Sequence, residues 1–562
     1  MATIFSSHQL LKSIRFLQTY RRIQLRRKSF FGDKNIELGE TTLTGRLLRY
    51  LNSFNVHGNE NFIPVKDPIK LKTTGLNKCN IEQIKTSVRL LDISQDINNF
   101  YLLRAIDKEC SARVNKLSNA DIFELLHIYM SKVPNRIINY KLYEIAIQEL
   151  TKRLNLLNKN EIIQLIFYIG LRKKQAKQHN IVRKCINYLI RSDLETLTPE
   201  DLCVICNSTF KTTTKLNEKI FNTIINYLYN NLKILKDPAF FVTFLKSIRQ
   251  NRYQDEDLLE TLSYGMLFNK SFEQYSFSAL SHILAVYSDY LYYDENVLRV
   301  FSERSIQLLK ESDFISKKEH MSNHIRLKDI KRFLWCISNL NYKLSSQDIK
   351  TVIIPNILKR VKAGDVESDH SSLAEIALYL WMLNYRAYEL FPFFLTKHNI
   401  RNIYGVNTHT KQRLNLLITC ISYENKELLK DLSIPPAVQL DYDMKYQLEK
   451  RPELQRICSD LQTSIGNSEL NKFELSCQVP GVNIIGITGY KNNTHSSVFL
   501  EVLDEYTRLK NTESMPTGLM ELKLRLLNQL DEAVVLVDTE ELKDLNSSEI
   551  RELLLDEIEF VC

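Results

Sequence analysis

Glycine is scarce in this sequence, with only 14 glycines among 562 residues. Gly481, Gly486 and Gly489 form neither a G-x-G-x-x-G motif nor a P-loop, so no phosphate-binding loop is predicted. His-Arg-Asp and Asp-Phe-Gly motifs are also absent, and we therefore reject protein kinase activity. No apolar run approaches the roughly 20 residues that cross a bilayer, so we expect no membrane span.

Cysteine chemistry is equally sparse. The ten cysteines of this long chain do not make a disulfide framework. Cys203-x-x-Cys206 is the only CxxC, and no second pair lies at zinc-ligand spacing. Both cysteines stand in an apolar helical run with Leu202 and Ile205, so we expect them in the core. No metal site is predicted from cysteine.

Acidic residues are missing from the beginning of the chain, where residues 1–32 carry basic side chains only. Apolar residues such as Leu10, Ile14 and Leu17 fall mostly on one side of a helix. This composition is typical of a mitochondrial presequence, and the alternative is a basic amphipathic surface helix. We expect residues 1–32 to direct the protein to the mitochondrial matrix, and residues 33–80 to be a loose polar leader.

From Ile81 to about residue 400 the apolar residues recur at helical spacing. Helix-start signatures at Ser118, Asn158, Thr198 and Asp237 recur about every 40 residues. A helical hairpin repeated at this period predicts an α-solenoid, which we place at residues 81–325 and expect to continue without a sheet to about residue 400. The period alone leaves open whether the ligand is RNA or protein.

The C-terminal stretch has a different pattern. The apolar run Val498–Asp504 predicts a strand, and leucines at helical spacing from Leu519 to Leu530 predict a helix. The β-branched run Ala533–Val537 predicts a second strand, and a last helix is expected over about Ser547–Glu557. Strand, helix and strand in this order predict a parallel pair in a small α/β domain.

This stretch resembles a known module. Met515-Pro516-Thr517-Gly518, then Leu522-Lys523-Leu524-Arg525, a valine-rich strand and Glu540-Glu541-Leu542 are similar to the RAP domain of organellar RNA proteins. The usual Gly-Tyr is Asp531-Glu532 here, and Leu542 replaces the usual tryptophan. Upstream, residues 326–400 and 408–490 resemble the two FAST-type regions, in the order typical of the FAST kinase domain-containing family. Trp335 and Trp381 of the first region are expected in the core.

The resemblance implies a mostly α protein: an α-solenoid followed by a restriction-endonuclease-like α/β domain at residues 497–557. It implies a mitochondrial RNA-binding protein that acts in the processing, stability or maturation of mitochondrial transcripts. The partners implied are mitochondrial RNA and other mitochondrial RNA-processing proteins. No cofactor is implied for RNA binding itself.

Charge supports an RNA partner. Residues 1–32 carry +7 and residues 501–562 carry −10, so the total of +9 leaves +12 for residues 33–500. A basic array attracts a phosphate backbone. Further basic residues, Arg249, Arg252 and Lys270, come later in the array. The residues that we expect to contact RNA are Arg172, Lys173, Lys174, Lys177, Arg183, Lys184, Lys211 and Lys215.

Two alternatives stay open. The α/β domain resembles a reduced nuclease core, in which carboxylates hold Mg²⁺ and a lysine stabilises charge. Glu501, Asp504, Glu541 and Lys523 are the candidate residues, although Glu501 also has a structural interpretation as an ion pair with Lys523 or Arg525. If the domain is not a nuclease, replacing Asp504 by alanine should leave folding nearly intact. The second alternative is a protein-binding scaffold without RNA.

Overall fold

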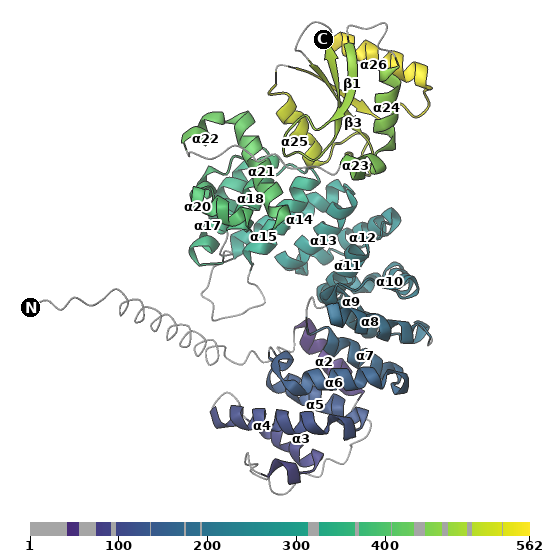
Figure 1. Ribbon diagram of the computed structural model, residues 1–562, viewed down its shortest axis with the longest axis vertical. Helices are drawn as coiled ribbons and strands as arrows, with labels where there is room; N and C mark the ends of the chain where they lie inside the picture. Colours follow the sequence, from purple (N-terminus) through teal and green to yellow (C-terminus); the bar gives the residue numbers. More distant parts are fainter. Residues whose placement is uncertain are drawn as a thin grey trace, which may run out of the picture. The chain divides into compact units, whose positions relative to one another are not determined.

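The computed structural model describes residues 42–54, 75–91, 97–134, 136–172, 176–191, 194–312, 325–365, 370–405, 407–431, 444–463, 470–491, 497–530 and 532–561. The described chain is mostly helical, with a small four-stranded sheet near the C-terminus (Figure 1). The predicted presequence, residues 1–32, lies outside the described residues. No helix of the described ranges combines the length and the apolar character that crossing a membrane requires.

The chain divides into two compact units, with the boundary between Leu228 and Tyr229. The first unit is built from α-helices joined by short turns, several of which are 3-10 helices. Its α-helices are α2 (Leu43–Ser53), α3 (Ile81–Leu90), α4 (Ile97–Arg113), α5 (Asn119–Lys132), α6 (Lys141–Lys152), α7 (Lys159–Ile169), α8 (Ala176–Leu189), α9 (Pro199–Thr212) and α10 (Glu218–Asn230), the last of which crosses the boundary.

The predicted helix starts are confirmed. Ser118, Asn158 and Thr198 cap α5, α7 and α9, and each forms a capping box with the acidic residue three positions later. Asp237 and Ser276 cap the corresponding helices of the second unit through their side chains. A polar cap satisfies backbone N–H groups that the first turn of a helix leaves open, which explains why these polar turns recur.

Contacts between the helices recur with the same period. Arg113 and Arg153 lie 40 residues apart in the sequence, and each pairs with a glutamate one helical turn before it. Each guanidinium also donates to carbonyl oxygens of the preceding turn, as in the bond from Arg153 Nη1 to the Leu117 oxygen at 2.7 Å. Alternate helices pack on one another, for example α3 on α5, α7 on α9 and α4 on α6. Such arginines stabilise the contact between successive hairpins.

Part of the expected loose leader is folded. Residues 43–53 form α2, whose side chains Leu47, Leu48 and Leu51 are buried. The hydroxyl of Tyr50 donates to Asp201 of α9 at 2.8 Å. The expectation of a loose segment was therefore wrong for these residues, because leucines at a spacing of three and four give a short helix an apolar face to bury.

The second unit begins with paired helices and ends with the sheet. The described residues between 81 and 400 contain helices and turns but no strand, as predicted. The α-helices of the second unit are α11 (Pro238–Asn251), α12 (Glu256–Phe268), α13 (Phe277–Tyr290), α14 (Glu295–Glu311), α15 (Leu327–Asn339), α16 (Ser346–Asp348), α17 (Ile354–Lys362), α18 (Ser371–Met382), α19 (Phe391–Phe394), α20 (Lys397–Tyr404), α21 (Thr408–Glu424), α22 (Lys426–Asp431), α23 (Met444–Lys450), α24 (Pro452–Gln462), α25 (Gly518–Leu527) and α26 (Ser547–Val561), with a π-helical turn at Ile349–Ile353 before α17.

The sheet has the strand order β1-β2-β3-β4, with β1 at Leu470–Ser476, β2 at Gly486–Lys491, β3 at Ser497–Leu503 and β4 at Ala533–Asp538. The predicted strands are β3 and β4, and they are parallel, with α25 as the crossover between them. β1 and β2 are antiparallel additions at residues 470–491, where no strand was predicted. Two glycines in β2 and polar residues in β1 weaken the apolar signal by which strands are predicted.

The two faces of the sheet differ in their cover. Val498, Leu500 and Val502 of β3 form a hydrophobic core with α24 and α26. α25 lies against the sheet on its other side (Figure 1), where Lys523 of α25 pairs with Glu501 of β3. At Gly486 of β2 a Cβ atom would collide with the Glu501 carboxylate, so glycine is required where the carboxylate passes the neighbouring strand.

The α/β module also contacts the helices before it. α25 packs against α15, α18 and α21. A Cβ atom at Gly518, the first residue of α25, would collide with the carbonyl oxygen of Ser338 near the end of α15. The loop before α25 pairs with the turn after α13, since Lys510 N donates to the Leu291 oxygen at 2.7 Å and Tyr293 N donates to the Lys510 oxygen at 3.0 Å. The glycine of the Met-Pro-Thr-Gly motif thus permits close contact between two helices.

Candidate nucleic-acid interface

Arg172, one of the predicted RNA contacts, is engaged in contacts within the protein. Its Nη2 donates to the backbone oxygen of Ile138 at 3.1 Å, and its guanidinium carbon lies 5.6 Å from the ring centroid of Tyr143. The side chain is only partly exposed. Arg172 therefore contributes to the contact between hairpins, and part of its hydrogen-bonding capacity is already used.

The other predicted RNA contacts that the structure describes are spread over two helices and a turn. Arg183 and Lys184 are exposed on α8, Lys211 is partly exposed near the end of α9, and Lys215 is exposed in the turn that follows. The side chains of the remaining three predicted residues are not among those that the structure describes. Lys173 and Lys174 lie outside the described residues, as does the side chain of Lys177.

The second unit contains a more coherent set of cations, which we call the basic face. It lies on α11, α13, α15, α18 and α21, which pack in this order, each against the next. Its basic residues are Lys246 and Arg249 on α11, Arg326, Lys331 and Arg332 at α15, and Arg413 on α21. The exposed fractions of the Arg326 and Arg413 side chains are 43% and 40%.

Carboxylates of the basic face lie beneath its cations. Asp329 is buried, with 1% of its side chain exposed, and it accepts hydrogen bonds from both Arg326 and Arg332. Burial raises the pKa of Asp329, but the two guanidinium groups outweigh this effect and hold its pKa below the ordinary value. The negative charge is therefore retained and hidden, whereas the cations reach solvent.

The same arrangement recurs on one neighbouring helix, α18, but not on α13. Glu375 on α18 is also buried, and it pairs with Lys331 at 3.2 Å and Arg413 at 2.8 Å. Asp289 on α13 pairs with Arg249 at 2.6 Å and is more exposed. The basic face thus contains six cations and these three carboxylates, at least five of the cations are paired with a carboxylate, and its net charge is +3.

Sequence reasoning missed most of this face. Of its residues only Arg249 was noted as basic, because the others are single charges scattered over several helices. Arg249, Arg332 and Arg413 follow one another at intervals of about two repeats. A search for basic residues at multiples of the repeat period could have found them.

The candidate catalytic residues of the α/β module form neutralised pairs. Glu501 on β3 and Lys523 on α25 are both fully buried, with 2.5 Å between Oε1 and Nζ. Burial raises the pKa of Glu501 and lowers the pKa of Lys523, since a charged group is poorly solvated between sheet and helix. Neither charged group has a further hydrogen-bond partner among the described residues. The structural pairing of Glu501 with Lys523 is confirmed.

Asp504 has a buried arginine as its partner. Its Oδ2 accepts from Arg451 Nε at 2.6 Å, and the Arg451 side chain is fully buried. The other oxygen, Oδ1, accepts from Thr507 and from the backbone N–H of Tyr506. The buried pair leads us to expect that Asp504→Ala destabilises the module, in place of the nearly intact folding predicted from the sequence, because the change would leave the Arg451 guanidinium without its carboxylate.

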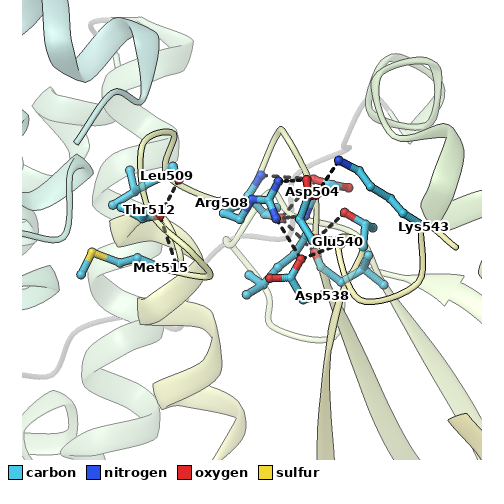
Figure 2. Close-up of polar contacts among 12 residues, drawn as sticks. Asp504, Arg508, Leu509, Thr512, Met515, Asp538, Glu540 and Lys543 are labelled. Atoms are coloured by element: carbon cyan, nitrogen blue, oxygen red, sulfur yellow. Dashed lines mark hydrogen bonds and ion pairs between the residues drawn. The ribbon is translucent and has the colours of Figure 1, made fainter. Parts of the chain in front are cut away.

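A second set of charges lies where the parallel strands end (Figure 2). Arg508 Nη1 pairs with Asp538 Oδ1 at 3.0 Å, and its Nη2 pairs with Glu540. Lys543 pairs with the other oxygen of Glu540 at 2.5 Å. Asp504 and Asp538 thus lie at the carboxyl ends of β3 and β4, each beside an arginine.

These pairs do not fit the metal site of a nuclease core. Magnesium needs carboxylate oxygens that are free to coordinate it, whereas Glu501 and Asp504 each contact a buried cation. Glu541, the last predicted carboxylate, is exposed after β4. We derive no metal-dependent step from this arrangement.

Arg525, the alternative partner for Glu501, does not pair with it. It pairs with Glu424 of α21 at 2.8 Å, and its Nη2 donates to the Trp381 oxygen at 2.7 Å. Glu424 also accepts from the indole N–H of Trp381 and pairs with Arg386. The carboxylate therefore joins α25 of the module to α18 and α21, and this contact could not be predicted between residues so far apart in the sequence.

Two other candidate sites have structural explanations. Glu82, Asp121 and Glu124 place carboxylate oxygens close enough to hold a metal ion. The ammonium of buried Lys85 lies among them, 2.5–2.7 Å from one oxygen of each. Burial disfavours this charge, but the carboxylates outweigh it and raise the pKa of Lys85.

The predicted assignment of Cys203 and Cys206 to the core is confirmed, since both side chains are fully buried in α9. Their burial between packed helices is enough to explain why both cysteines occur in an apolar run, and no metal or redox role is needed for this explanation.

No family model matches the chain, and no curated protein sequence matches it.

Proposed function

We propose that the protein is a mitochondrial RNA-binding protein that acts in post-transcriptional control of mitochondrial transcripts. The observation that carries this proposal is the basic face, where cations reach solvent and carboxylates are buried beneath them. The field outside such a surface is positive, and a phosphate backbone is the cellular polyanion that it best fits. The acid-free residues 1–32 support a mitochondrial location.

Under this proposal the helical part is an α-solenoid and the C-terminal module is a RAP-like domain. The recurring caps, the arginine contacts one repeat apart and the parallel β3–β4 pair support this interpretation. The module serves as a docking and structural element, since its buried charges are paired and Arg525 joins it to Glu424. Other mitochondrial RNA-processing proteins are the partners that this role would require.

The test is the salt dependence of RNA binding. The variant Arg249→Gln/Arg326→Gln/Arg413→Gln removes three cations of the basic face while sparing its buried acids. Asp329 keeps Arg332 as a partner, and Glu375 keeps Lys331. For single-stranded RNA the plot of log K against log salt should become less steep by about 2, which weakens binding at about 0.1 M salt about a hundredfold.

A matched control removes three cations elsewhere. Arg299 and Lys310 on α14 and Arg456 on α24 are exposed to 51%, 57% and 43%, and each is paired with an acid. Replacing all three by glutamine gives the same change in net charge and should leave the salt slope near that of the wild type. Equal slopes in both variants would contradict a role for the basic face.

The alternatives give different outcomes. A protein scaffold would show no salt-sensitive RNA binding, and a nuclease would cut RNA in the presence of Mg²⁺. Location is tested separately, by fusing residues 1–40 to a reporter, which should enter mitochondria. Retention of the fusion in the cytosol would remove the support for a mitochondrial role.

A further inference from the structure

The two tryptophans of the chain occupy opposite environments. Trp381 is fully buried, donates its indole N–H to Glu424 and stacks on Phe391 with ring planes 13° apart. Trp335 was expected in the core as well, but it is partly exposed on α15.

Trp335 lies inside the basic face. The guanidinium of Arg249 is 5.7 Å from its ring centroid, close enough for a cation–π contact. Arg249 belongs to α11 and Trp335 to α15, and α13 packs between these helices. Side chains from both flanking helices therefore meet above α13, where Arg249 also pairs with Asp289.

The surroundings of Trp335 favour an anion. Arg332, three residues before it, and Arg326 share the buried Asp329. His282 on α13 stays neutral, since burial first and then Lys246, Arg332, Arg249 and Arg326 lower its pKa. Its Nδ1 is buried without a hydrogen-bond partner among the described residues. The site thus combines an aromatic ring with several cations.

We propose that Trp335 is a stacking platform for one unpaired base of an RNA strand, with the adjoining phosphates on Arg326 and Arg332. This inference rests on the proposed function and adds to it that the RNA is single-stranded at this point. A base stacks on an aromatic ring only where it has left a duplex, and stacking tolerates any base because every base has a π-face. Arginine at the ring adds its charge to the contact.

The experiment uses the fluorescence of Trp335 in the full-length protein. A 12-nucleotide oligouridylate is added, with excitation at a wavelength that uracil does not absorb, and binding is followed independently by anisotropy of a labelled oligonucleotide. The buried Trp381 provides a constant background. We expect the emission to fall along the binding curve, and a duplex of equal length to cause little quenching.

Variants separate stacking from charge. Trp335→Leu should bind about tenfold more weakly with an unchanged salt slope, because a stacked ring is lost but no cation is removed. Trp335→Phe retains a ring, so it should bind within about threefold of the wild type, while its remaining emission is not quenched. If the leucine variant fails to fold, the phenylalanine variant alone carries the test.

The outcomes distinguish this inference from the proposed function. RNA that binds in a salt-sensitive way without quenching, or a Trp335→Leu variant that binds like the wild type, would overturn the stacking platform and leave RNA binding intact. Duplex RNA that quenches as strongly as the single strand would also overturn it. A complete lack of salt-sensitive binding would instead reject the proposed function.

Discussion

The buried pair of Glu501 and Lys523 makes a sharp prediction about stability. Lys523→Met removes the ammonium and keeps the length of the side chain, whereas Glu501→Leu removes the carboxylate. Both wild-type side chains are fully buried, with 2.5 Å between the charged atoms. Each single variant therefore leaves one charge without its partner between β3 and α25, whereas the double variant leaves none.

The expected magnitudes follow from this geometry. Breaking a buried ion pair on one side costs about 3–5 kcal/mol, because the remaining charge is uncompensated. Replacing both partners by apolar residues of similar volume is neutral or stabilises by about 1–4 kcal/mol. We expect each single variant to be strongly destabilised and the double variant to be at least as stable as the wild type.

Amide hydrogen exchange measures these changes where they occur. A chain of two units need not unfold in one step, so peptides from β3 and α25 report the local opening free energy better than a global transition does. As a control, Lys543→Met removes an exposed ammonium paired with Glu540 and should leave the stability nearly unchanged, because solvent screens this pair.

The effect of pH identifies the charge. Burial raises the pKa of Glu501 above the unfolded value of about 4.3. When the folded state raises the pKa of a carboxyl group, the protonated carboxyl favours the folded state. This contribution to the free energy of unfolding is complete below the unfolded pKa, and it is lost as pH rises through the folded pKa. The penalty of Lys523→Met should therefore be larger at pH 8 than at pH 5. Equal penalties at both values, or a single variant as stable as the wild type, would refute the reasoning.

Three further predictions concern other contacts. Gly518→Ala places a methyl group against the end of α15 and should lower the local opening free energy of α25, measured by amide hydrogen exchange, by about 1–3 kcal/mol. In the control Gly405→Ala the added methyl group meets only ordinary contacts, so the opening free energy should change little. Asp504→Asn leaves buried Arg451 uncompensated and should lower the stability of the module by about 3–5 kcal/mol, measured by limited proteolysis; resistance like that of the wild type would contradict the buried pair. The pKa of Asp329 is lowered in the folded state, so its carboxylate stabilises the helices above about pH 4 and this stabilisation is lost as pH falls. Amide hydrogen exchange of α15 between pH 6 and pH 3 measures the loss, which should be absent in Asp329→Asn.

The local elements of this protein could be read from its residues. Ser118, Asn158 and Thr198 were predicted to begin helices, and each caps one in the structure. The parallel pair β3–β4 followed in the same way from two apolar runs with a helix between them. Capping and apolar periodicity depend on neighbours within one or two turns, so sequence order contains the necessary information.

Where the local signal is weak, prediction failed. β1 and β2 were missed because glycines and charges interrupt them, and the pairing of β1 with β2 and of β2 with β3 supplies the stability that their own residues lack. α2 was missed because it is a short helix in a polar stretch, held by leucines that bury against the first unit. In both cases tertiary contacts outweigh local preference.

Which partner each charge meets was decided by the tertiary structure alone. Arg172 and Arg249 are both basic residues of the helical array, yet the first hydrogen-bonds the turn of a neighbouring hairpin and the second lies over Trp335 on the basic face. Arg525 and Glu424 are far apart in the sequence and join α25 to α21. The sequence by itself determined the helices, their period and the balance of charge, because these depend on near neighbours and on composition. The partners of each buried or exposed charge depend on which helices pack together, and only the folded chain sets those distances.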